Sequence, residues 1–69
     1  MTLHDIVQHT YHQNDYKHFN LIVFDQNNAN NFEGNLGEYF AGNFPIDKGS
    51  PVQAYGFIDE TRTLVAFVN

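Results

Sequence analysis

Two segments of this 69-residue chain carry apolar side chains on both sides of a predicted strand, and that pattern constrains the fold more than any other feature. Residues 63–68 (TLVAFV) and residues 18–25 (HFNLIVFD) are both rich in β-branched and aromatic residues, which is typical of strands. A strand that is apolar on both sides is normally covered on both sides. The alternating sets are Leu64, Ala66 and Val68 against Val65 and Phe67, and Phe19, Leu21 and Val23 against Ile22 and Phe24.

The length of the chain limits how such strands can be covered. We expect residues 1–69 to form one domain, of which about 60 % of the unfolded surface is buried on folding. Domains of this size usually recruit disulfides, a metal ion or a second subunit. The chain has no cysteine, so disulfides and thiolate-bound metals are excluded and the other two routes gain weight.

Residues 3–14 are predicted to form a helix. Thr2 and Asp5 have the spacing of a capping box, with Asp in the usual place of Glu or Gln. Asn14 and Asp15 follow as a stop signal. One helical face is apolar over most of its length and comprises Leu3, Ile6, Val7, Thr10 and Tyr11.

The C-terminal part of the chain is predicted to form an antiparallel hairpin. Two β-rich runs, residues 52–59 and 63–68, flank a short polar turn at residues 60–62. In the first run, three small or aliphatic residues alternate with two aromatic ones: Ala54, Gly56 and Ile58 against Tyr55 and Phe57.

The middle of the chain is less regular. Residues 26–31 (QNNANN) are expected to form a loop, since Asn tolerates turn conformations. In residues 32–44, Asn35 and Glu38 are spaced as a helix cap, and Gly42 can close a short helix. The same segment also has the spacing of a strand, with Phe32, Leu36 and Phe40 on one side. We favour the short helix.

These elements predict an α+β fold: an N-terminal helix packed on a small, mainly antiparallel sheet of three to four strands that ends in a C-terminal β-hairpin. One helix covers only one face of such a sheet. The second face is then covered either by residues 32–44 or by another subunit, and we favour self-association or a protein partner. The C-terminal strand can lie at a sheet edge, open to pairing, or in the middle of the sheet.

Charge excludes one class of partner. Three basic residues against eight carboxylates give a net charge of −5, so the chain cannot neutralise a phosphate backbone and nucleic acid is not expected as a partner. An acidic protein of this size can instead mimic nucleic acid, but the carboxylates are spread singly along the chain. The sequence shows no signal peptide and no run of 18–20 apolar residues, so we expect a cytoplasmic protein with no membrane contact.

A weak metal-site pattern lies on the predicted helix. Asp5, His9 and His12 are spaced i, i+4, i+7 and share one face, which is a workable set for zinc, nickel or copper. The alternative is a solvated polar face. The four histidines also allow a pH-responsive protein, because protonating all of them moves the net charge from −5 to about −1. We expect no cofactor.

Tyr39, Phe40 and Phe44 form an aromatic cluster in the least regular segment. Aromatic residues are enriched at interface hot spots, so these three are the predicted partner-binding residues. The alternative is that they belong to the core.

Catalysis has little basis in the sequence. The single serine, Ser50, lies in a Gly-Ser-Pro turn rather than at a strand-to-helix elbow. We therefore expect a small acidic, non-enzymatic protein that acts through protein–protein contact, as a homodimer, in the role of a regulatory or inhibitory subunit. The alternatives are a histidine-based metal-binding or pH-responsive protein and an acidic inhibitor that mimics nucleic acid.

Overall fold

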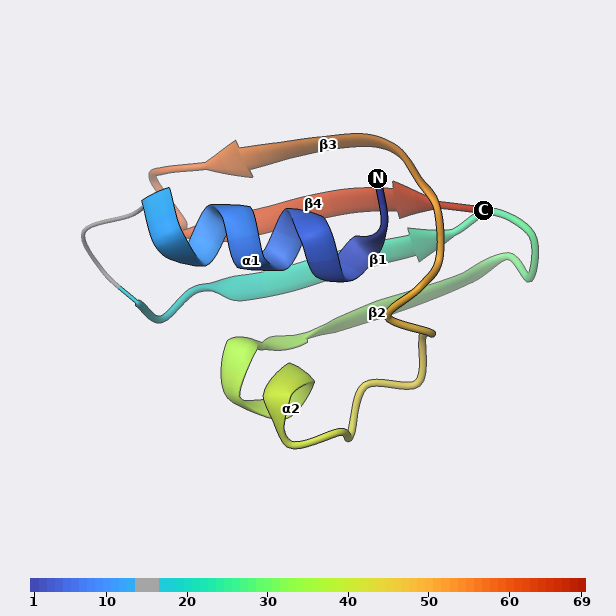
Figure 1. The fold of residues 1–69 in the computed structure, drawn as a ribbon, viewed down its shortest axis with the longest axis horizontal. Helices are drawn as coiled ribbons and strands as arrows, with labels where there is room; N and C mark the ends of the chain where they lie inside the picture. Colours follow the sequence, from blue (N-terminus) through green and yellow to red (C-terminus); the bar gives the residue numbers. More distant parts are fainter. Residues whose placement is uncertain (14–16) are drawn as a thin grey trace.

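The computed structural model describes residues 1–13 and 17–69 of the chain (Figure 1). The α+β class is confirmed, with an N-terminal helix, a sheet, a short second helix and a C-terminal hairpin. The elements, in chain order, are α1 (Leu3–Gln13), β1 (Asn20–Asp25), β2 (Asn30–Asn35), α2 (Leu36–Phe40), β3 (Val52–Ile58) and β4 (Thr63–Val68).

The described residues form one four-stranded sheet in the order β2-β1-β4-β3. β1 pairs antiparallel with β2, and β3 pairs antiparallel with β4, so the predicted hairpin is confirmed. The two central strands, β1 and β4, run parallel to each other. Because β4 lies in the middle of the sheet, the C-terminal strand offers no open edge, and the edges are β2 and β3 (Figure 1).

The predicted capping box at the start of α1 is confirmed. Thr2 N donates to Asp5 Oδ2 at 3.0 Å, and Asp5 N donates to Thr2 Oγ1 at 3.3 Å. The next two backbone N–H groups at the start of α1, those of Leu3 and His4, donate hydrogen bonds to backbone carbonyls in the loop before β3. Four backbone N–H groups at a helix start lack intrahelical partners, so this loop and Thr2 together complete the helix start. Asn14 and Asp15, the predicted stop, lie outside the described residues.

The ambiguous middle segment contains both a strand and a helix. Asn35 is the last residue of β2. Its side chain accepts a hydrogen bond from Glu38 N at 2.9 Å, which caps α2 as predicted. Gly42 has a φ of +83° just after the helix, a conformation that glycine adopts without strain. The predicted loop at 26–31 is too long, because Asn30 and Asn31 already belong to β2.

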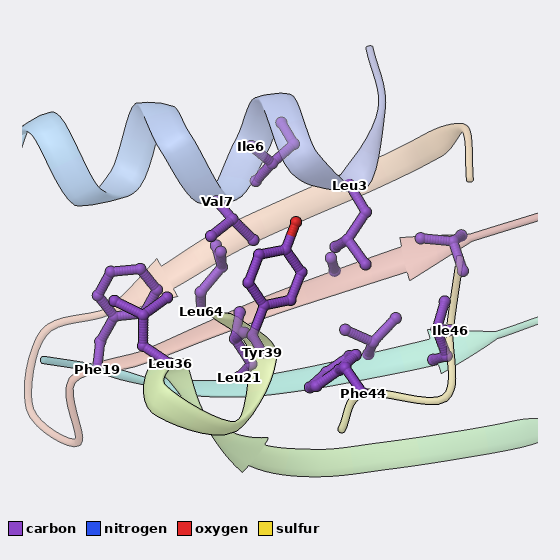
Figure 2. Packing of buried hydrophobic residues seen from close by; sticks show 13 residues of the cluster. Leu3, Ile6, Val7, Phe19, Leu21, Leu36, Tyr39, Phe44, Ile46 and Leu64 are labelled. Carbon is purple, nitrogen blue, oxygen red and sulfur yellow. The ribbon is translucent and has the colours of Figure 1, made fainter. Parts of the chain in front are cut away.

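Both helices pack on the same face of the sheet (Figure 2). Leu3, Ile6 and Val7 of α1 meet Leu36 and Tyr39 of α2 in one buried cluster. Residues 32–44 therefore do not cover the second face, and that alternative is wrong. The cluster comprises Leu3, Ile6, Val7, Phe19, Leu21, Val23, Leu36, Tyr39, Phe44, Ile46, Leu64, Ala66 and Val68.

Removing the carboxylate at Asp5 should weaken the fold in a pH-dependent way. The hydrogen bond from Thr2 N lowers the pKa of Asp5 below its ordinary value of 3.8. A depressed folded-state pKa adds stability above the unfolded pKa, and this stability is lost as pH falls through the folded-state pKa. The free energy of unfolding of Asp5→Asn should therefore lie below that of the native chain at neutral pH and converge with it in acid.

Urea unfolding followed by circular dichroism, from neutral pH to about pH 2, measures this difference. Glu60→Gln, in the exposed turn between β3 and β4, is the control and should change the free energy of unfolding little at neutral pH. A difference between Asp5→Asn and the native chain that stays constant down to the lowest pH contradicts the capping role.

Candidate functional site: the uncovered face of the sheet

The face of the sheet that points away from both helices is apolar. In the parallel register of the central strands, Ile22 lies beside Val65 and Phe24 beside Phe67. Across the hairpin, Phe67 pairs with Ala54. Within residues 1–13 and 17–69, no helix packs on this face. We call it the open face, and it consists of Ile22, Phe24, Ala54, Gly56, Ile58, Val65 and Phe67.

Two aromatic rings stack on the open face, near the C-terminal ends of the two central strands. The ring centroids of Phe24 and Phe67 are 4.9 Å apart, and the ring planes differ by 16°. Phe67 keeps 36 % of its surface exposed although it stands on a central strand, and Ile58 on β3 keeps 47 %. Central strands of a sheet usually bury such side chains, so this exposure marks a surface suited to contact.

Charged and polar side chains lie at the border of the open face. On β2, the residues that share the open face are Asn31, Glu33 and Asn35, and they border it along one side. β1, β4 and β3 add no charged side chain to this face. An apolar centre with a polar margin is the usual anatomy of an interface. The three strands that carry the open face span about 20 Å by 14 Å, or roughly 300 Å², at the lower end of the range of the largest apolar patches on monomers.

The predicted partner-binding residues do not form one surface. Tyr39 is fully buried and Phe44 is 8 % exposed, so both belong to the core, as the alternative interpretation proposed. Phe40 is 48 % exposed on α2, where its ring packs edge-on against Tyr11. Of the three, Phe40 is accessible to a partner, and contact through Phe40 stays a prediction.

Tyr39 joins the two helices. Its hydroxyl is hydrogen-bonded to Nδ1 of His4 at 2.7 Å, and Gln8 Nε2 lies 3.2 Å from the other ring nitrogen of His4. The Lys48 ammonium lies 4.9 Å from the centre of the Tyr39 ring, which is a cation–π contact. Burial raises the pKa of Tyr39 to about 12, so the hydroxyl stays protonated at neutral pH. This arrangement fits a structural role.

The predicted metal set on α1 gains no geometric support. The Asp5 carboxylate is already bound to Thr2 N. His12 packs edge-on against Tyr11, and His9 lines the space between α1 and β3. Among the described residues, no three His, Asp or Glu side chains lie close enough together to hold a metal ion. Metal binding at Asp5, His9 and His12 stays a prediction.

Several carboxylates satisfy nearby backbone groups. Asp25 Oδ1 accepts from Asn27 N at 3.1 Å, and its Oδ2 accepts from Asn28 Nδ2 at 2.8 Å. Asp47 Oδ1 accepts from Gly49 N at 2.9 Å, much as Asp5 accepts from Thr2. These are local turn and cap contacts, in which Asp commonly serves. Some of the carboxylates therefore serve local turns and caps, and they do not form a row of negative charges that resembles a phosphate backbone.

A concavity of about 430 Å³ lies at the end of the sheet where α2 begins, with His18, Asn35 and Arg62 on its walls. It is wide open to solvent. Ligand pockets usually bury most of their ligand, so this concavity would enclose a bound molecule only in part.

No protein family, curated protein or solved structure shows significant similarity to the chain. No helix in the described part of the chain is long and apolar enough to cross a bilayer. Any proposal of function therefore rests on the geometry of the described residues.

The sequence pattern predicts the residues of the open face, but it does not predict the hydrogen bond between Tyr39 and His4. Alternation in residues 18–25 and 63–68 already places Ile22, Phe24, Val65 and Phe67 opposite the core residues. In contrast, His4 and Tyr39 are 35 positions apart, and no local pattern links them.

The variants Phe44→Ala and Phe40→Ala should show by their stability which of the two side chains lies in the core. Phe44→Ala leaves a cavity under α2 and should lower the free energy of unfolding by about 3–5 kcal/mol. Phe40→Ala, on the exposed side of α2, should lower it by about 1 kcal/mol or less. Urea unfolding of both variants measures the values. Equal losses for the two variants contradict the placement of Phe44 in the core.

Proposed function

We propose that this chain is a non-enzymatic, cytoplasmic binding protein that acts through protein–protein contact, as a homodimer, in a regulatory or inhibitory role. One observation supports the proposal above the others. The two central strands carry the stacked pair Phe24 and Phe67 on a face that no described helix covers.

The area of the open face supports binding of moderate strength. Burying roughly 300 Å² of apolar surface contributes about 7–8 kcal/mol before costs. Association costs about 4–15 kcal/mol in lost translation and rotation. The face of one copy is therefore sufficient for weak binding, and firm binding needs more area or a second contact.

The chemistry of the face indicates the kind of partner. Because the centre of the face is uncharged, the matching surface is an apolar protein surface rather than a basic one. Binding of this kind depends little on salt. An acidic mimic of nucleic acid would instead lose its basic partner by roughly 0.3 M salt, since exposed charges are screened.

Capture from the cells that make the protein tests the proposal. The immobilised chain is compared with Phe67→Ser, which changes the open face, and with Tyr55→Ser, a matched exposed aromatic on the other face of the sheet. We expect at least one protein to be retained by the native chain and by Tyr55→Ser, to be lost with Phe67→Ser, and to persist at about 0.5 M salt.

Circular dichroism spectra and melting curves establish that both variants remain folded. If each protein that the native chain captures is also captured by folded Phe67→Ser, the open face is not the contact surface. If capture disappears in salt, the acidic surface carries the binding and the proposal fails.

A further inference from the structure

A second concavity lies at the other end of β1, between the turn that joins β1 to β2 and the loop that follows α2. Its volume is about 230 Å³, and it is more enclosed than the concavity beside α2. Asp25 and Asn30, which pair across the two strands, line it from the sheet, and Pro45 and Ile46 line it from the loop. Asp25 alternates with the core residue Val23, so this concavity lies on the face that the helices cover and is separate from the open face.

The Asn-rich turn supplies the polar groups of this concavity. Asp25 Oδ1 accepts from the backbone N–H groups of Asn27 and Asn28, at 3.1 and 3.4 Å, and Asp25 Oδ2 accepts from Asn28 Nδ2 at 2.8 Å. A carboxylate has about four acceptor positions, so Oδ2 can accept one more hydrogen bond. The side-chain amide of Asn30 makes no hydrogen bond to another residue that the structure describes, which leaves donors and an acceptor for a ligand.

The charge of the lining fits a neutral ligand. No Lys, Arg or His is among the described residues that line the concavity, so an anionic group would find no cationic partner there. Asp25 is the one charged residue in this described lining, and its carboxylate already accepts three N–H groups of its own turn. Calcium takes about six to eight oxygen ligands and binds more firmly as the number of carboxylates rises, so a single carboxylate in use by its turn is a poor calcium site.

The apolar residues of the lining are held in place by the core. Ile46 is buried, and Phe32 is half-buried against the core cluster. The ring centroids of Phe32 and Phe44 are 3.8 Å apart, and the ring planes differ by 60°, so Phe32 is packed firmly beside the concavity. A fixed apolar surface with a few converging polar groups is the usual composition of a small-molecule site.

We propose that this concavity binds one pyranose ring of a neutral saccharide. Each sugar hydroxyl both donates and accepts hydrogen bonds, which matches the mixed donors and acceptors of Asp25, Asn28 and Asn30. The C–H groups of the ring match the apolar surface of Phe32 and Ile46. The volume is below the roughly 300–1,000 Å³ of pockets for drug-sized ligands, so it suits a single ring, with the rest of a longer saccharide in solvent.

NMR titration of the native chain tests the proposal, with D-glucose, D-galactose, D-mannose and N-acetyl-D-glucosamine as probes and glycerol as the acyclic control. We expect at least one of the four sugars to shift the backbone amide signals of Asn28, Asn30, Phe32 and Ile46 in a saturable way. The expected dissociation constant is about 1–10 mM, as befits a small ligand that is only partly enclosed. Glycerol at the same concentration should shift these signals little.

Two variants of the same turn test the residues. Asn30→Ala removes an amide from the lining and should raise the dissociation constant at least fivefold. Asn27→Ala is the matched control, because Asn27 belongs to the same turn but does not line the concavity, and it should leave the constant unchanged. Circular dichroism melting curves establish that both variants remain folded.

Three results overturn the proposal. The first is the absence of saturable shifts with all four sugars up to about 50 mM. The second is equal binding by the native chain and folded Asn30→Ala. The third is a shift of the same signals by calcium chloride or glycerol when no sugar shifts them, which would identify a cation site or nonspecific contact. None of these results bears on the capture experiment, so the saccharide site and the open face are tested separately.

Discussion

The packing of both helices on one face of the sheet determines the rest of this structure. Tyr39 holds the arrangement together, because its ring fills the core between α1 and α2 and its hydroxyl is bound to His4. The loop that leads into β3 adds to this by accepting the first amides of α1. With both helices committed to the same side, the described chain has no helix left for the other side.

The packing of both helices on one face explains why the opposite face of the sheet is apolar and exposed. The central strands alternate strictly, so burying Leu21, Val23 and Leu64 under the helices forces Ile22, Phe24 and Phe67 onto the opposite face. Sheets with one covered face normally carry polar residues on the other. Here the polar residues on that side lie on β2 and at the first positions of β1 and β4, Asn20 and Thr63, and the open face itself is apolar and uncharged. This exposed apolar surface is the basis for the binding role that we propose.

Much of this fold could be predicted from the sequence, because its signals are local. The capping box at Thr2, the cap at Asn35 and the β3–β4 hairpin each depend on residues a few positions apart. The parallel pairing of β1 with β4 brings together segments more than 30 positions apart, and no local pattern specifies it. The sequence alone could not decide whether Tyr39 and Phe44 are buried or exposed, because an aromatic cluster in an irregular segment is equally typical of a core and of an interface.

The central claim is that the chain leaves its own open face uncovered, and solution NMR with a soluble paramagnetic probe measures this most directly. In a dilute sample, signals from Ile22, Val65 and Phe67 should broaden strongly, while those of the core residues Leu21, Val23 and Leu64 should be protected. Equal protection of the two sets would show that the chain covers both faces itself, and it would contradict the account.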